Sequence, residues 1–132
     1  MSAGEIPDIV EHVSAVPFDV TLERLTAAVA RAGLTLFNRI DHQAGARDAG
    51  LEMPPAMVLT YGHAKGGTPV MVAAPLAALD LPLRVLVRVR EDGRTAIAFH
   101  AIGAVLRHAG VPDPLATRLE PAQRLLVDAV TL

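Results

Sequence analysis

Residues 84–100 read RVLVRVREDGRTAIAFH, and this stretch gives the clearest signal for the fold. Its three valines alternate with arginine and leucine, which is the period of two expected of a strand with one buried face. Asp92-Gly93 is a strong hairpin signal, and the apolar residues after it form the returning strand. The stretch therefore predicts two antiparallel strands, over residues 84–90 and 95–100.

The length of the hairpin loop decides which side chains share a face, because side chains alternate along a strand. With a two-residue loop of Asp92 and Gly93, the valine face would be small enough for helices to pack closely on it. The residues joining the valines would be Ala96, Ala98 and His100, and those facing the other way would be Leu86, Ile97 and Phe99, with Arg84, Arg88 and Arg90 alongside.

Three further segments predict strands, because they are rich in β-branched or alternating apolar residues. The first ends in a turn at Pro17, and the third follows Pro54-Pro55, two prolines that interrupt regular secondary structure. The expected ranges are 9–16, 34–41 and 56–61.

Helical spacing of apolar residues is clearest between an N-cap expected at Thr21 and an end at Gly33. Shorter helices are expected at 43–49, from Thr68 and Pro69 to about Ala74, at 102–108, and after Glu120-Pro121. The fold class that follows is α+β: a single mainly antiparallel sheet of about five strands with helices packed on one face.

Composition favours one domain over residues 1–132, since 52% of the chain is hydrophobic and can supply a core. The C-terminal helices, residues 101–132, are expected to belong to it. Cysteine is absent, which excludes disulfides, cysteine nucleophiles and cysteine-ligated metals.

Charge and patterning also limit the expected partners. The net charge is −2 and the chain has only four aromatic residues, so neither nucleic acid nor a membrane is expected to bind. Residues 1–5 lack the basic start and apolar stretch of a secretory signal, and the uncharged run between Lys65 and Asp80 is too short to span a bilayer. A cytoplasmic location is expected.

The glycine-rich residues 62–68, GHAKGGT, are the most informative for function. A strand that leads through glycines to a helix N-terminus leaves backbone N–H groups pointing outward beside a positive dipole end, which suits an anion. Thr68 stands where a phosphate-binding loop has its lysine, so nucleoside triphosphate hydrolysis is not expected. The expected ligand-binding residues are Gly62, His63, Lys65, Gly66, Gly67 and Thr68, with His42 nearby.

Lys65 is the single lysine among twelve basic residues. Its compact ammonium suits a point contact to phosphate or carboxylate, and a solvated turn residue is the alternative. His42 and His63 each follow a predicted strand and are expected to reach one rim of the sheet, which makes them the best acid–base pair. A surface or capping role is the alternative for each histidine. No histidine pair has the spacing of a zinc protease, and no metal or cofactor is expected.

The order of these motifs resembles the bacterial and archaeal domain of unknown function 302 family, over about residues 18–100. The resemblance rests on the helix ending at Gly33, the strand exit from Phe37 to His42, the loop at 62–68, and Asp80-Leu81-Pro82-Leu83 before a hairpin. Members typically have asparagine and proline where this chain has His63 and Ala64, and often an aromatic residue at the position of His100. The resemblance implies a compact α+β domain and a homodimer, and no established activity.

Three functional hypotheses follow. The first is a homodimeric small-ligand-binding domain that holds an anionic group at residues 62–68. The second is a structural or protein-interaction domain that dimerises through its exposed sheet face. The third is an enzyme in which His42 or His63 acts as general base and Lys65 or the loop amides stabilise negative charge.

Overall fold

The computed structural model describes residues 9–131, which form one five-stranded sheet with helices. Neighbouring strands are all antiparallel, and their order across the sheet is β1-β5-β4-β3-β2. The strands are β1 (Ile9–Val13), β2 (Thr35–Asp41), β3 (Ala56–Gly62), β4 (Leu83–Val89) and β5 (Thr95–His100). The predicted α+β class with one antiparallel sheet is confirmed.

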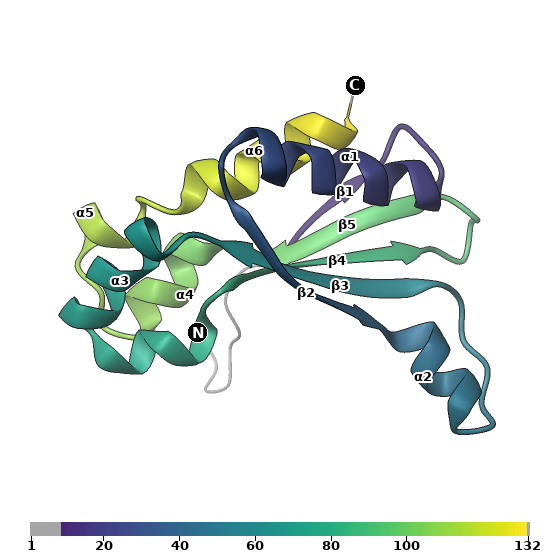
Figure 1. Ribbon diagram of the computed structural model, residues 1–132, viewed down its shortest axis with the longest axis horizontal. Helices are drawn as coiled ribbons and strands as arrows, with labels where there is room; N and C mark the ends of the chain where they lie inside the picture. The colour runs from purple at the N-terminus through teal and green to yellow at the C-terminus, as the bar shows by residue number, and fades with distance from the viewer. Residues whose placement is uncertain (1–8, 132) are drawn as a thin grey trace.

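Helices fill the connections between the strands and the C-terminal part of the chain. They are α1 (Phe18–Arg31), α2 (His42–Asp48), α3 (Ala64–Ala73), the 3-10 helix η1 (Pro75–Asp80), α4 (Ile102–His108), α5 (Asp113–Ala116) and α6 (Glu120–Val130). Helices α1 and α6 lie together over one face of the sheet, whereas α3, α4 and α5 gather at one end of it and α2 projects from the other (Figure 1).

The core lies between the sheet and the α1–α6 layer. Leu25 and Val29 of α1 are buried because they recur on one face of the helix, and they pack above Val85 and Val87 of β4. Leu126 of α6 is buried in the same cluster. Helix α6 is thus part of the core.

The hairpin between β4 and β5 differs from the sequence prediction by one residue. Its loop has three residues, 91–93, because the Gly93 N–H donates to the Arg90 carbonyl at 2.9 Å and the Arg90 N–H donates to the Arg94 carbonyl at 2.8 Å. Gly93 has φ +82°, the left-handed conformation that closes this type of turn. Val87 therefore pairs with Ile97.

The shifted register exchanges the two faces of β5. Ile97 and Phe99 join the valines in the core, while Ala98 lies beside Leu86 on the opposite face. No helix within residues 9–131 crosses this open face (Figure 1), where Arg88 forms an ion pair with Glu11 at 3.3 Å. The expectation that Ile97 and Phe99 would be exposed with Leu86 is wrong, because one extra loop residue places every side chain of β5 on the opposite face of the sheet.

Two further boundaries were predicted wrongly at the start of the chain. Strand β1 ends at Val13 instead of residue 16, because the amides of Ser14 and Ala15 donate to the carbonyls of Thr95 and Val130. Helix α1 begins at Phe18, so Thr21 is not its N-cap. The hydroxyl of Thr21 is buried and donates to the Val16 carbonyl at 3.0 Å.

Candidate ligand-binding cleft

The glycine-rich segment forms the first turns of α3, which begins at Ala64 and not at Thr68 as the sequence predicts. The imidazole of His63 caps the helix, because its Nδ1 accepts a hydrogen bond from the Lys65 N–H at 3.0 Å. Serine, threonine, aspartate and asparagine are the usual N-caps, so the sequence favoured Thr68 followed by Pro69. Pro69 instead lies inside the helix.

Because α3 begins at Ala64, its own hydrogen bonds occupy the backbone N–H groups that the sequence analysis assigned to an anion. The amides of Gly66 and Gly67 both donate to the His63 carbonyl at 3.0 Å, and the Lys65 amide is bonded to the His63 ring. The expectation that these amides point outward as free donors is therefore wrong. Side chains of the same segment remain available for a ligand.

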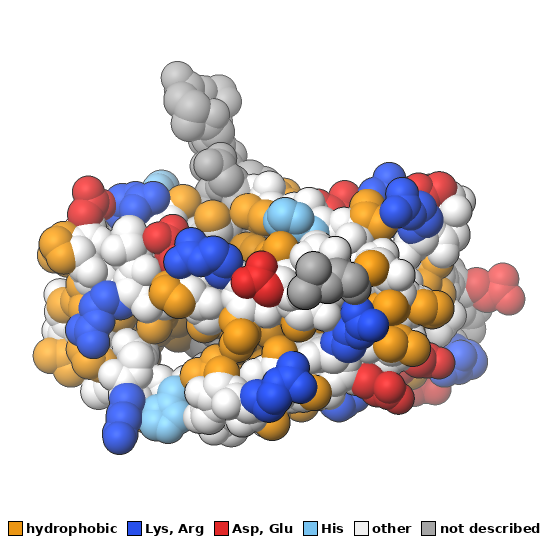
Figure 2. All heavy atoms as spheres, turned by 90° about the horizontal axis from the view of Figure 1, so that it is seen from above, with side chains coloured by type: hydrophobic (Ala, Val, Ile, Leu, Met, Phe, Trp, Pro, Cys, Tyr) orange, Lys and Arg blue, Asp and Glu red, His pale blue; other side chains and the backbone are white. Residues whose placement is uncertain are grey.

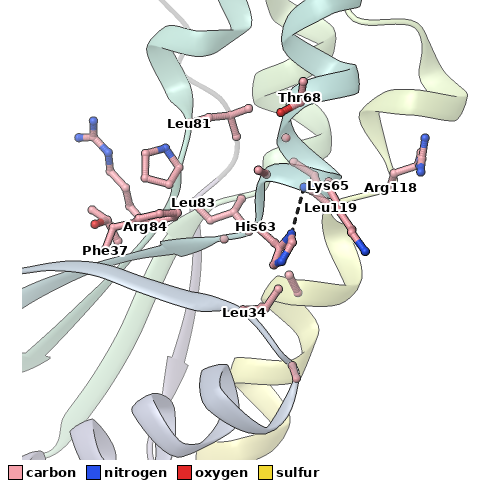
Figure 3. Close-up of a pocket in the computed structure, with 18 of the residues that line it drawn as sticks. Leu34, Phe37, His63, Lys65, Thr68, Leu81, Leu83, Arg84, Arg118 and Leu119 are labelled. Atoms are coloured by element: carbon pink, nitrogen blue, oxygen red, sulfur yellow. Dashed lines mark hydrogen bonds between the residues drawn. The ribbon is translucent and has the colours of Figure 1, made fainter.

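These side chains line a cleft of about 920 Å³ at the end of the sheet. Its walls come from the turn after α1, the adjoining ends of β2 and β3, the first turns of α3, the start of β4, and the start of α6. The lining residues fall within 32–38, 60–71, 81–84 and 118–122. The cleft thus joins segments that are far apart in the sequence (Figure 3).

The lining of the cleft is mainly apolar, with positive charge at its edge. Leu34, Phe37, Leu81, Leu83 and Leu119 contribute large apolar side chains. The charged ends of Lys65, Arg84 and Arg118 lie at the periphery of the group (Figure 3). No aspartate or glutamate lines the cleft, and none of the three cations forms an ion pair within residues 9–131.

Gly66 allows α6 to approach the first turn of α3. A Cβ atom at this position would lie 3.0 Å from Cδ2 of Leu119, which is tighter than an ordinary van der Waals contact. Glycine here therefore leaves room for Leu119 in the wall of the cleft.

The structure brings six of the seven predicted site residues to this cleft: Gly62, His63, Lys65, Gly66, Gly67 and Thr68. His42 does not line it. Strands β2 and β3 are antiparallel, and Asp41 at the end of β2 pairs with Met57 of β3. His42 follows Asp41, so it lies at the opposite end of the strand pair from Gly62. Met57 and Gly62 are five residues apart, or roughly 17 Å along β3. His42, His63 and Lys65 therefore do not form the predicted acid–base group.

The sequence analysis missed two cations of the cleft. Arg84 was assigned to the exposed sheet face because of its alternation with valine, and it does lie on the same face as Leu86. Its position near the start of β4 also brings it to the edge of the cleft, which the alternation could not indicate. Arg118 precedes α6 and had no local signal. Only tertiary contact between α6 and α3 reveals it.

Titration and metal chemistry give no further site in the described part of the chain. Tyr61 is buried, and this desolvation raises the pKa of its phenol. Within residues 9–131, no three histidine, aspartate or glutamate side chains converge as metal ligands would. None of the helices in that range combines the length and the apolar character needed to cross a membrane.

The family described as "Domain of unknown function DUF302" matches residues 10–131. The chain belongs to the DUF302 family. This match confirms the predicted resemblance and extends it beyond residues 18–100 to include α4, α5 and α6. The crystal structure of an uncharacterised conserved DUF302 protein from Bacillus stearothermophilus has a TM-score of 0.84 and covers 92% of this chain and 97% of its own. At 18% identity, it supports the fold alone.

Curated relatives include "Fluoride-specific ion channel FluC 1" of Brucella suis biovar 1, which is 41% identical over 73 residues, or 55% of this DUF302 chain. The protein of the same name from Brucella abortus biovar 1 is also 41% identical over 73 residues. The match spans only 28% and 26% of those two proteins, about a quarter of their length.

Proposed function

We propose that this DUF302 protein binds a small amphipathic anion in the cleft: a molecule with an apolar body that ends in a carboxylate or a phosphate. The observation that carries the proposal is the lining, in which a mainly apolar wall meets Lys65, Arg84 and Arg118 without a carboxylate. Ligand pockets of this size are typically apolar, with a few polar groups that fix the orientation of the ligand.

The three cations suit such a ligand because none of them has to leave an ion pair with another residue of the range 9–131 to bind it. Arginine can hold a carboxylate or phosphate through two parallel hydrogen bonds, and lysine supplies a point charge. His63 adds a donor: its Nδ1 accepts from the Lys65 amide, so the neutral ring carries its proton on Nε2. The apolar wall would contribute about 25 cal/mol for each Å² of ligand surface it buries.

The test is a thermal-shift titration of the full chain with medium-chain fatty acids, aromatic carboxylates and phosphate monoesters, each beside an uncharged analogue. A ligand that binds only the native state, at a free concentration of about 100 times its Kd, stabilises that state by roughly 2.7 kcal/mol. This raises Tm by several degrees. We expect this shift for the anions and not for their neutral analogues. Lys65→Ala and Arg118→Ala should each reduce it.

Arg47→Ala is the matched control, because Arg47 is an exposed arginine in the last turn of α2, outside the cleft. It should leave the ligand shift unchanged. Equal binding of neutral analogues, or an unchanged shift in both cleft variants, would remove the proposal. Sodium fluoride belongs in the same screen because of the relatives' name. If fluoride stabilises the protein more than chloride does while apolar anions have no effect, the ligand is a halide and not an amphipathic anion.

A second candidate is self-association through the open face of the sheet. The observation that favours it is the centre of this face, where Val58, Leu86 and Ala98 are side by side on neighbouring strands with no helix of the described chain above them. Arg88 and Glu11 neutralise each other beside this centre. A second copy could therefore cover the apolar centre without burying these two charges unpaired.

A further inference from the structure

Three polar side chains form a row across the open face of the sheet, at the end that borders the cleft. Asn38 of β2 pairs with Thr60 of β3, and Thr60 pairs with Arg84 of β4. Directly paired side chains share a face, with Cβ atoms about 4.5–5.5 Å apart. Leu83 and Val85, on either side of Arg84, are buried in the core, so the row faces away from α1 and α6. All three residues line the cleft, and we call them the polar row.

The side-chain donors of the polar row have no partner within residues 9–131. Oδ1 of Asn38 accepts a hydrogen bond from the Arg39 N–H at 2.8 Å, which leaves two N–H donors on Nδ2. The Thr60 hydroxyl and the Arg84 guanidinium form no hydrogen bond or ion pair with another side chain of that range. An amide, a hydroxyl and a guanidinium on neighbouring strands can together donate to one carboxylate or phosphate.

The other two cations of the cleft lie beyond the end of the sheet. Lys65 is in the first turn of α3, and Arg118 directly precedes Leu119, which packs against Gly66. The charged ends of Lys65 and Arg118 lie at the opposite side of the cleft from that of Arg84 (Figure 3). The cleft therefore has two positive ends.

Apolar side chains lie between the two positive ends. In Figure 3, Leu81 and Leu83 are placed between Arg84 and Lys65. Five residues of chain separate Thr60 in the polar row from Lys65, so their Cα atoms are at most roughly 17 Å apart. A single small anionic group is therefore expected to occupy one end and leave the cations of the other end without a counter-charge.

We propose that the ligand of the cleft is a dianion, with an anionic group at each end of an apolar body. This inference rests on the proposed function, because it assigns a second anionic group to the ligand of the same cleft. One group would accept hydrogen bonds from the polar row, and the other would contact Lys65 and Arg118. The apolar body would pack on Leu81 and Leu83 between them.

Recognition of two anionic groups depends on these local positions. The net charge of −2 gives the molecule no overall attraction for anions. Figure 2 shows acidic and basic side chains mixed over the side of the molecule that carries α1 and α6. Selectivity for a dianion would therefore come from the donors at the two ends of the cleft, where no aspartate or glutamate of the described chain competes for them.

The test is isothermal titration calorimetry of the full chain with saturated dicarboxylates from adipate to tetradecanedioate, each beside the monocarboxylate of the same chain length. We expect a dicarboxylate that is long enough to reach both ends to bind about tenfold more tightly than its monocarboxylate, since hydrogen bonds to a charged group are worth about that factor or more. Dicarboxylates too short to reach both ends should lose this advantage.

Two substitutions in the polar row test the second end. Arg84→Ala should weaken dicarboxylate binding about tenfold and leave monocarboxylate binding nearly unchanged, because a monocarboxylate can still use the end with Lys65. Thr60→Val removes the hydroxyl but keeps the side-chain shape, and it should weaken dicarboxylate binding by about three- to tenfold. Arg39→Ala is the matched control, because Arg39 is an exposed arginine next to Asn38 that does not line the cleft. It should leave both affinities unchanged.

The failure of this inference is distinguishable from the failure of the proposed function. If monocarboxylates and dicarboxylates bind equally at every length, or if Arg84→Ala weakens both classes equally, the second anionic group is wrong and binding of a single anion stands. If neither class binds, the proposed function falls and this inference falls with it. Circular dichroism melts establish that the variants fold, and the comparison of the two ligand classes in the unaltered chain depends on no variant.

Discussion

Single residues show why local signals located one wall of the cleft but not its chemistry. Glycines around Lys65 marked residues 62–68 in the sequence, and all of the predicted residues in that stretch line the cleft. A capping role was one of the alternatives that the sequence offered for His63, and the structure shows it at the start of α3. Residue type alone could not choose this role, because a histidine ring caps a helix only in a suitable side-chain orientation. His42 was misplaced because "after a strand" does not specify which end of an antiparallel sheet is meant.

Among the residues that the structure describes, Tyr61 combines a buried hydroxyl that lacks a hydrogen-bond partner with a raised pKa. Its side chain is fully buried between β2 and β4 partners, and its hydroxyl has no hydrogen-bond partner among the described residues. A buried hydroxyl without a partner costs roughly 1–3 kcal/mol. The same burial raises the pKa of the phenol, because the charged form would lose its hydration.

We therefore expect Tyr61→Phe to increase the free energy of unfolding by about 1 kcal/mol at pH 7. In the unaltered chain, the unfolded state ionises first as pH rises above about 10, so alkali favours unfolding. The advantage of the variant should then grow by up to about 1.4 kcal/mol per pH unit. Urea unfolding followed by circular dichroism at pH 7 and between about pH 9.5 and 11 measures both effects. A variant that is less stable than the unaltered chain at pH 7 would mean that the Tyr61 hydroxyl has a hydrogen-bond partner in the folded protein.

At the scale of elements, periodicity predicted the strands well, and the hairpin register failed for a specific reason. Alternating valines identify a strand whichever way it faces, but the partner of each residue depends on the loop length. Asp92-Gly93 fits a two-residue turn and also the last two positions of a three-residue loop with glycine in the left-handed conformation. The structure uses the second arrangement, with Gly93 at φ +82°.

We expect Gly93→Ala to lower the free energy of unfolding by about 1–2 kcal/mol, the cost of a left-handed conformation for a residue with Cβ. The cost is purely conformational, because a Cβ at Gly93 would meet no atom within 4 Å. Gly45 in α2 is the matched control: a Cβ there also meets no atom within 4 Å, but the backbone is helical. Gly45→Ala should stabilise the protein by roughly 0.5–1 kcal/mol. Urea unfolding of both variants gives the comparison, and a neutral Gly93→Ala would contradict the proposed turn.

At the scale of the whole molecule, the cleft exists because the chain returns to the sheet after β5. Helix α6 packs on α1 and brings Arg118 and Leu119 to the first turn of α3. Sequence patterns predicted α6 as an amphipathic helix, but which face of which element it would cover is a tertiary property. Because the same layer of helices covers one face of the sheet, the other face is left open to solvent or to a partner.

Self-association through this open face predicts the oligomeric state of the protein, which no single helix or strand determines. Leu86 lies at the centre of the face, on β4 between Val58 of β3 and Ala98 of β5. Leu86→Arg would put a charge into a symmetric contact opposite its own copy, which costs far more than it would on a free surface. We expect sedimentation velocity to show a dimer for the unaltered chain and a folded monomer for the variant. Leu51→Arg adds the same charge at an exposed leucine away from the face and should stay dimeric. A monomer for the unaltered chain, or a dimer that persists in Leu86→Arg, would assign the apolar centre of the sheet to some other role.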